Sequence, residues 1–135
     1  MDTFRTLLIN PKDKVCQVVD LVKESYFKHA YALMNVELLD VVFLELEGHL
    51  FTILCDDEAL LKNEIYFSLF DSNSPLIAGN VIIMHESPVD EDGNSILLDL
   101  TDEEIEIIQK NLVTVTNSTT GETNLAVANL KYPNY

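Results

Sequence analysis

Apolar and polar residues alternate, or give way to short β-branched runs, along much of the chain. Alternation places one set of side chains on each face of a strand, so this pattern predicts a sheet. The predicted strands span residues 4–9, 15–19, 41–46, 50–55, 76–84 and 95–100, and residues 65–70 are expected to be extended. The run 76–84 is the most apolar, and we expect it at the centre of the sheet. An Asn-Pro-Lys-Asp turn at residues 10–13 predicts a hairpin between the first two strands.

Two segments instead repeat apolar residues every three or four positions, which is typical of amphipathic helices. The first spans residues 21–34, with Asp20 expected to cap its N-terminus. The second follows Thr101, whose hydroxyl can accept from the backbone of Glu104 while the Glu104 carboxylate reaches back. This capping box predicts a helix from residue 102 to about residue 111. The acidic run 56–58 is expected to begin one further helical turn.

The last part of the chain is rich in Thr and Asn, and its two alternating runs flank a turn cluster at 117–121. This pattern predicts a hairpin. The predicted fold class is α+β: a mostly antiparallel sheet of five to six strands, two main helices and a C-terminal β-hairpin tail. We expect one domain over residues 1–112, with residues 113–135 as an extension packed on or beside it. The predicted core comprises Leu8, Val18, Phe27, Leu44, Ile53, Leu54, Ile77, Val81, Ile83, Leu98, Ile105 and Ile108.

The composition supports a folded domain, because 47% of the 135 residues are hydrophobic. A disordered acidic tail would lack this apolar material. The two cysteines, Cys16 and Cys55, lie in apolar runs and are expected to be buried, and a disulfide between them stays open. No signal peptide and no apolar stretch of membrane-spanning length is visible, so we expect a cytosolic protein that does not enter membranes.

Charge is distributed unevenly along the chain, whose net charge is −15. Residues 1–31 hold five basic and four acidic groups, whereas residues 32–135 hold three basic and nineteen acidic groups, a net of −16. Such a surface repels phosphate backbones and anionic lipid heads, which argues against direct binding to nucleic acid or membranes. It suits a basic protein partner, a cation, or simple solubility.

A calcium site is the first metal site to consider, because Asp90, Asp92 and Gly93 resemble part of an EF-hand loop. With Gly93 at the sixth position, the first position falls on Pro88 and the twelfth on Asp99, so the pattern fails and a hairpin turn is favoured. The three histidines are far apart in sequence and have no zinc-type spacing with cysteine. We therefore expect no bound metal.

Catalytic motifs are also missing from the sequence. There is no Gly-x-Ser-x-Gly elbow, no glycine-rich phosphate loop and no cysteine in a reactive context. The carboxylate runs 56–58 and 102–104 are explained by the starts of helices, where acids are favoured. We therefore expect a protein that is not an enzyme and holds no cofactor.

Four segments together resemble a family of small uncharacterised proteins of phages and plasmids, mostly of Gram-positive bacteria. They are LLINPKDK, LFTILCDDEALLKNEIYF, IAGNVIIMHES and DEDGNSILLDLTDEEIEII. The resemblance covers roughly residues 5–112. It implies a mobile-element origin and expression in a bacterial cytosol, and it carries over no catalytic residues. The tail departs from the family pattern, and the helix predicted at 21–34 is more basic and aromatic than the family implies.

The leading functional hypothesis is a non-enzymatic inhibitor that binds a basic host defence protein in place of DNA. Carboxylates spaced on a rigid scaffold can imitate the phosphates of a duplex and steer encounter with a basic groove. The candidate acidic interaction surface comprises Asp56, Asp57, Glu58, Asp90, Glu91, Asp92, Asp102, Glu103 and Glu106.

Two alternatives belong to other classes. The protein could sequester a small ligand, such as a nucleotide signal, through the cations and aromatic residues of its N-terminal part. The residues of this alternative site are Arg5, Lys12, Lys23, Tyr26 and Lys28. The protein could instead be a structural or assembly module that pairs through its tail hairpin, and a homodimer is compatible with each hypothesis.

Overall fold

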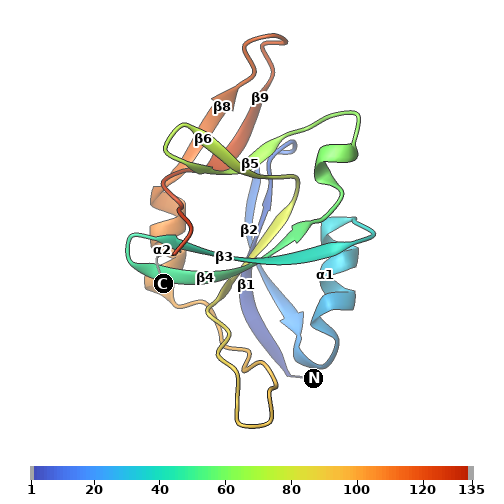
Figure 1. Ribbon diagram of the computed structural model, residues 1–135, viewed down its shortest axis with the longest axis vertical. Helices are drawn as coiled ribbons and strands as arrows, with labels where there is room; N and C mark the ends of the chain where they lie inside the picture. The colour runs from blue at the N-terminus through green and yellow to red at the C-terminus, as the bar shows by residue number, and fades with distance from the viewer. Residues whose placement is uncertain (1, 134–135) are drawn as a thin grey trace.

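The fold is α+β, with two antiparallel-dominated sheets and two α-helices (Figure 1). The computed structural model describes residues 2–133, so Met1 and the last two residues of the predicted extension lie outside the described part. The main sheet has five strands and the second sheet has four, whereas the sequence predicted one sheet of five to six strands. Short strands therefore form two layers, which the strand pattern alone did not reveal.

The main sheet is antiparallel throughout, in the order β2-β1-β7-β4-β3. Its central strand β7 buries four consecutive apolar side chains because both faces of the sheet are covered. The predicted N-terminal hairpin is confirmed, and the Asn10 side chain accepts from the backbone of Asp13 at 3.0 Å. The strands of this sheet are β1 (Thr3–Asn10), β2 (Val15–Val22), β3 (Leu39–Leu46), β4 (His49–Asp56) and β7 (Val81–His85).

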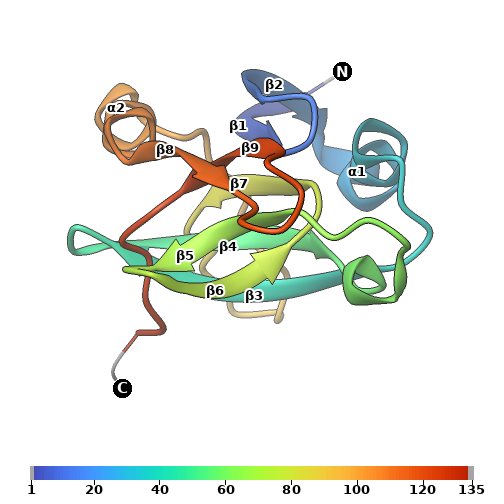
Figure 2. The same ribbon diagram turned by 90° about the horizontal axis from the view of Figure 1, so that it is seen from above.

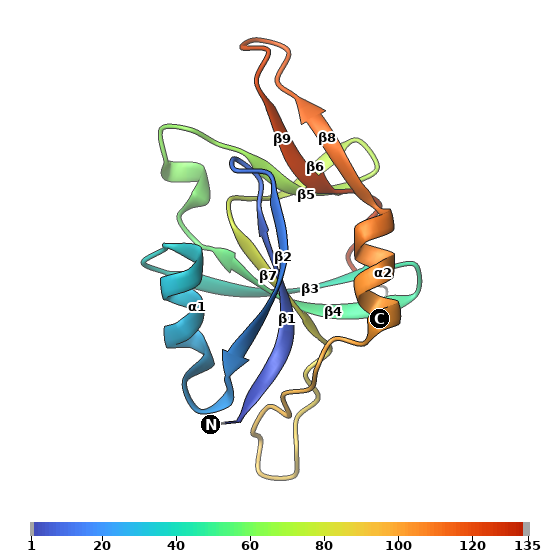
Figure 3. The ribbon, with the colours of Figure 1, turned by 180° about the vertical axis from the view of Figure 1, so that it is seen from behind.

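The second sheet has the order β6-β5-β9-β8 and lies at one end of the long axis (Figures 1 and 3). The tail forms the predicted hairpin, but β9 also pairs in parallel with β5 through Leu69 and Val127. The tail therefore supplies two of the four strands of this sheet, β8 and β9. The strands are β5 (Phe67–Asp71), β6 (Ser74–Ala78), β8 (Leu112–Thr116) and β9 (Thr123–Val127).

The single strand predicted at 76–84 is wrong, because the chain turns at Gly79 and its two halves enter different sheets. Gly79 has a φ of +85° and donates its N–H to the Tyr66 carbonyl at 2.8 Å. A Cβ at this position would lie 3.1 Å from the Cβ of Ala59. Glycine is needed both for the left-handed backbone and for this close approach.

Helix α1 (Tyr26–Met34) begins later than the predicted helix at 21–34. Asp20 lies inside β2 instead of capping a helix, and Leu21 pairs with Phe4 in the sheet and is fully buried. Burial of Leu21 in the strand outweighs the helical spacing of the apolar residues that follow it, which begins at Val22. A short 3₁₀ helix, η1 (Lys23–Ser25), then leads into α1.

Helix α2 (Asp102–Lys110) confirms the predicted capping box. The Thr101 hydroxyl accepts from the Glu104 N–H at 3.1 Å, and the Glu104 carboxylate accepts from the Thr101 N–H at 2.9 Å. The two helices lie apart with β1 and β2 between them (Figure 2). Helix α1 covers one face of the main sheet, whereas α2 and the second sheet pack on the other.

Half of the predicted core is fully confirmed: Leu44, Ile53, Leu54, Val81, Ile83 and Ile108 are buried. Leu8, Ile77 and Ile105 are half-buried at the margins of the core. Val18, Phe27 and Leu98 are more than 40% exposed, so their assignment to the core was wrong. Val18 lies on the edge strand β2, Phe27 stacks outward on Tyr26, and Leu98 lies in a loop and not in the strand predicted at 95–100.

Candidate functional site

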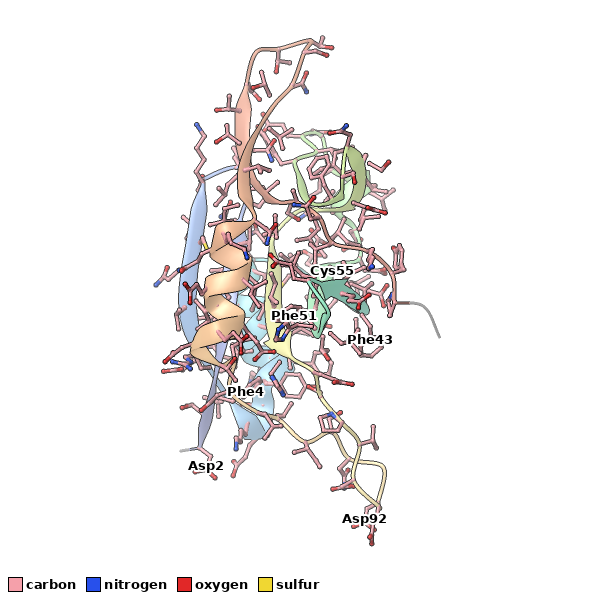
Figure 4. The ribbon with its side chains drawn as sticks, turned by 90° about the vertical axis from the view of Figure 1, so that its left-hand side faces the viewer. Asp2, Phe4, Phe43, Phe51, Cys55 and Asp92 are labelled. Carbon is pink, nitrogen blue, oxygen red and sulfur yellow. The ribbon has the colours of Figure 1, made fainter. Side chains whose placement is uncertain are left out.

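A long loop between β7 and α2 projects from one end of the molecule (Figure 1, bottom). We call residues 86–100 the acidic loop; Asp92 lies at its tip (Figure 4). The predicted turn at 90–94 forms because the Asp90 carboxylate accepts from the backbone N–H groups of Asp92 and Asn94, both at 2.9 Å. Asp90 also donates its own N–H to the Asn94 carbonyl at 2.9 Å. The tip is therefore an ordered turn closed by its first carboxylate.

Arg5 of β1 fastens the base of the acidic loop to the main sheet. Its guanidinium donates two hydrogen bonds to the Leu100 carbonyl, at 2.6 and 2.9 Å, and lies 3.1 Å from the Asp102 carboxylate. The Arg5 backbone N–H donates to Asp99 at 2.7 Å. Because Leu100 is fully buried, the loop is held at its base while its tip reaches into solvent.

Carboxylates and apolar side chains are exposed together on the acidic loop. Val89 is 63% exposed, and Ile96 and Leu98 are each at least 40% exposed. The segment 86–109, which includes the loop and most of α2, holds nine carboxylates and no lysine or arginine. Within the described residues, no contact buries these apolar side chains, so apolar groups and carboxylates face solvent on the same loop.

Helix α2 continues the acidic loop with three exposed carboxylates, those of Asp102, Glu103 and Glu106. Glu103 lies 4.0 Å from the ring of His49. Glu104 differs, since it is buried and its Oε1 atom lies 2.8 Å from the Nδ1 atom of His85. Glu104 therefore has a structural role, and we define the acidic surface as the acidic loop together with Asp102, Glu103 and Glu106.

The other three predicted acids lie elsewhere, at the end of β4 and before the 3₁₀ helix η2 (Ala59–Leu61). The Asp56 side chain is only 2% exposed; one oxygen lies 2.7 Å from Lys62 Nζ and the other accepts from the Glu58 N–H at 2.9 Å. Asp57 is exposed and Glu58 is half-buried. The nine candidate acids therefore form two separate groups, and Asp56 does not belong to an exposed surface.

Asp56 lies beside a hollow of about 560 Å³, which we call the polar hollow. Four segments distant in sequence meet there: the β1–β2 turn, the end of α1, residues 56–66 and the Gly79 turn. The lining residues are Asn10, Pro11, Lys12, Asp13, Met34, Asn35, Asp56, Ala59, Lys62, Asn63, Glu64, Tyr66, Gly79 and Asn80. Of the sequence-predicted site residues, only Asp56 and Lys12 take part.

The charges of the polar hollow are largely paired with one another. Lys12 Nζ lies 2.9 Å from Glu64 and 5.9 Å from the centre of the Tyr66 ring. The hydrogen bond and the charge of Glu64 raise the pKa of Lys12, and the same hydrogen bond lowers the pKa of Glu64. Burial, followed by a hydrogen bond to Glu122, raises the pKa of Tyr66.

The cations and aromatic residue of the predicted small-ligand site are not brought together. Lys12 lies in the turn of the β1–β2 hairpin, whereas Lys23, Tyr26 and Lys28 follow its other end. Eight paired residues separate these ends by about 25 Å at the usual strand rise. Arg5 is occupied by Leu100 and Asp102. These residues do not form one pocket.

The two cysteines are free and lie on different strands of the main sheet. Cys16 lies opposite Ile9 in the sheet, Ile9 lies opposite Val81, and Val81 lies opposite Cys55. Three strand spacings, about 14 Å, therefore separate the two cysteines. A disulfide needs Cα atoms within about 7 Å, so this pair cannot form one. Burial raises the pKa of the Cys55 thiol to about 12 and also raises that of Cys16, the opposite of an activated nucleophile.

Within residues 2–133, no group of three or more His, Cys, Asp or Glu side chains is placed to hold a metal ion. No helix in the same residues is long and apolar enough to cross a membrane. Neither models of protein families, nor curated protein sequences, nor solved structures gave a match to this chain. The resemblance to phage and plasmid proteins therefore stays a prediction from sequence segments.

Sequence reasoning missed the polar hollow as a site. All of its residues except Met34 and Asn35 come from three of the four segments on which the family resemblance rests: LLINPKDK, the DDEALLKNEIY part of the second, and the IAGN part of the third. The signal in the sequence was an asparagine in each of three turns, at residues 10, 63 and 80. Each of these asparagines has an ordinary explanation as a turn former, so only their meeting in space marks the hollow.

Proposed function

We propose that the protein is a non-enzymatic binding protein that docks on a basic, nucleic-acid-binding protein through the acidic surface and inhibits it. The observation that carries this proposal is that the segment 86–109 exposes eight of its nine carboxylates, all but Glu104, together with the apolar side chains Val89, Ile96 and Leu98. Protein interfaces combine an apolar centre with a polar rim, and carboxylates around such a centre select a basic partner.

The remaining lysines do not neutralise this surface. Each of the three lysines after residue 31 lies beside a carboxylate outside it: Lys62 beside Asp56, Lys110 beside Glu47 and Lys131 beside Glu45. Arg5 lies at the base of the loop and neutralises one member of the surface, Asp102, at 3.1 Å. Within the described residues, no salt bridge reaches the carboxylates of Asp90, Glu91 and Asp92 at the loop tip. The field around the loop tip is therefore strongly negative, which accelerates encounter with a basic partner.

The carboxylates of α2 are too few to match the charge of a DNA duplex of the same length. Helix α2 has nine residues and is about 13 Å long, and it exposes three carboxylates. A duplex of that length carries about eight phosphates. The carboxylates therefore supply steering and selectivity, whereas the apolar side chains of the loop supply much of the affinity. The sequence resemblance to mobile-element proteins supports a bacterial host defence protein as the partner.

The test compares two triple variants that lose the same number of charges. The site variant carries Glu91→Gln, Asp92→Asn and Glu106→Gln, none of whose side chains bonds another described residue. The control carries Glu37→Gln, Asp57→Asn and Asp71→Asn, which are exposed and belong neither to the acidic loop nor to α2. Each protein is immobilised, exposed to bacterial lysate at about 50 mM salt, where long-range charge effects persist, and then to duplex DNA.

We expect the wild type and the control to retain a nucleic-acid-binding protein that DNA displaces, and the site variant to retain about tenfold less. The purified partner should also lose DNA binding when the wild-type protein is added. Equal retention by the site variant and the control would overturn the proposal, because it would show that total charge and not this surface governs binding.

A further inference from the structure

We infer that the polar hollow is a second binding site, independent of the acidic surface, for a small uncharged molecule rich in hydroxyl groups. A free sugar and the ribose of a nucleoside share this chemistry. The inference rests on the size of the hollow, the residues that build its floor, and the way its charges are paired.

The size of the hollow suits a small molecule. Its volume of about 560 Å³ lies within the range of small-molecule sites, about 300 to 1,000 Å³. Pro11, Met34 and Ala59 are buried and form an apolar floor, whereas the asparagines and charged residues surround it. Four distant segments meet there, so the hollow exists only in the folded chain. An apolar floor with convergent polar groups is the usual construction of a ligand site.

The Gly79 turn shapes one wall of the hollow. A Cβ at Gly79 would lie only 3.1 Å from the Cβ of Ala59, so a side chain there would crowd this wall, which the backbone bond to Tyr66 holds in place. The next residue, Asn80, donates its side-chain N–H to the Met34 carbonyl at 2.8 Å, which joins the wall to the end of α1. This bond fixes the orientation of the amide and leaves its oxygen as an acceptor on the lining of the hollow.

The paired charges argue against a charged ligand. Lys12 lies 2.9 Å from Glu64, and Lys62 lies 2.7 Å from Asp56. To bind a lysine, an anionic ligand would have to break one of these ion pairs, and a cationic ligand would have to do the same to bind a carboxylate. Asp13 adds a further negative charge to the lining, and no arginine lines the hollow. A phosphate-bearing ligand therefore meets a lining with a net negative charge.

Hydroxyl groups match what the lining offers. The carboxylates can accept hydrogen bonds, the lysines can donate them, and the side chains of Asn35 and Asn63 can do both. A hydroxyl donates and accepts at one atom, so neighbouring hydroxyls can bridge a lysine and its carboxylate without breaking the pair. Tyr66 lines the same hollow and presents an aromatic ring against which a sugar ring or a base can pack.

The experiment is a titration of isotopically labelled full-length protein, followed by the amide NMR signals of Gly79, Asn80 and Asn63. The ligands are adenosine, uridine, glucose, ribose and adenosine monophosphate, each to about 10 mM, a range that detects weak binding. We expect at least one neutral ligand to shift these signals, and the monophosphate to bind no tighter than adenosine. A response to free sugars identifies a sugar source, and a response to nucleosides alone identifies a nucleoside source.

Two variants locate the binding. The double variant Asn35→Gly, Asn63→Ala removes exposed amides that make no side-chain hydrogen bond within residues 2–133, and glycine keeps the left-handed backbone of Asn35 (φ +54°), so the fold should persist. We expect its affinity to fall about fivefold or more for the hydrogen bonds it loses. The control Asn73→Ala lies in the β5–β6 turn, outside the hollow, and should bind as the wild type does.

Three results would overturn the inference: no shift at these amides with any neutral ligand, tighter binding of the monophosphate by tenfold or more, or equal binding by the double variant. None of them bears on capture of a basic protein by the acidic surface, because neither Asn35 nor Asn63 belongs to that surface. Failure of one proposal is therefore distinguishable from failure of the other.

Discussion

Both the acidic surface and the polar hollow contain carboxylates, but most of those on the acidic surface have no cation beside them, whereas two of those in the polar hollow are paired with lysines. On the acidic surface, carboxylates reach into solvent and the segment 86–109 contains no lysine or arginine. In the polar hollow, Lys12 and Lys62 each lie within 3 Å of a carboxylate, and Asp56 is buried. One region presents an unbalanced field, whereas the other balances its charges locally.

This difference shows that net charge per segment does not identify a binding surface. Asp56 and Asp57 are neighbours in sequence, yet one is a buried structural group and the other is exposed. An acid contributes to long-range attraction only where no cation beside it cancels its field. The same acid contributes to stability only where it satisfies buried donors.

The most direct test of this difference is to replace one aspartate in each region and compare the losses of stability. Asp56→Ala should cost about 2 kcal/mol in the free energy of unfolding, because the Glu58 N–H and the Lys62 ammonium lose their acceptor. Asp92→Ala should change it by less than about 0.5 kcal/mol, because this side chain is exposed at the loop tip. Urea denaturation at neutral pH measures both values. Equal costs would show that Asp56 is not the structural group described above.

A smaller difference is expected between two glycines with nearly the same backbone. Gly79 has a φ of +85° and Gly93 a φ of +84°, so alanine is strained by about 1 kcal/mol at either position. Only at Gly79 would the new Cβ also meet Ala59, at 3.1 Å. We expect Gly93→Ala to cost about 1 kcal/mol and Gly79→Ala about 2 kcal/mol or more. Thermal and urea unfolding of the two variants give the comparison; a smaller loss at Gly79 would contradict the close packing of the hollow wall.

The features that sequence reasoning predicted correctly are those fixed by nearby residues. The Asn10–Asp13 turn, the Asp90 turn and the capping box between Thr101 and Glu104 each use hydrogen bonds across two to four positions. Such local chemistry is present in the sequence itself. The α+β class followed from these local elements.

The features that were missed depend on distant residues. The break at Gly79 lies inside one apolar run, and nothing in that run distinguishes a strand of the main sheet from a strand of the second. Helix α1 begins later than predicted because Leu21 is buried in β2 beside β1, and the helical spacing of the following apolar residues does not reveal that contact. The polar hollow was invisible because its residues come from four segments that only the folded topology brings together.

The smallest expected effect concerns the exposed pair Lys12 and Glu64 at the rim of the polar hollow. The hydrogen bond and charge of Lys12 lower the pKa of Glu64, so NMR titration should place the Glu64 midpoint below its ordinary value of 4.5. In Lys12→Met the midpoint should rise toward that value, whereas Lys28→Met, which removes a lysine from α1, should leave it nearly unchanged. An unchanged Glu64 midpoint in Lys12→Met would contradict the local balance of charge in the hollow.

The same pair gives a pH dependence whose sign follows from the lowered pKa of Glu64. A carboxyl whose pKa is lower in the folded than in the unfolded chain stabilises the fold above its unfolded pKa and loses this effect as the pH falls through its folded pKa. Lys12→Met should therefore be slightly less stable than the wild type at neutral pH and equally stable in strong acid. Because both side chains are exposed and screened by salt, the difference at neutral pH should shrink in high salt. A difference that persists in acid or in high salt would show that Lys12 stabilises the turn by packing its aliphatic chain on Tyr66 and not by its charge.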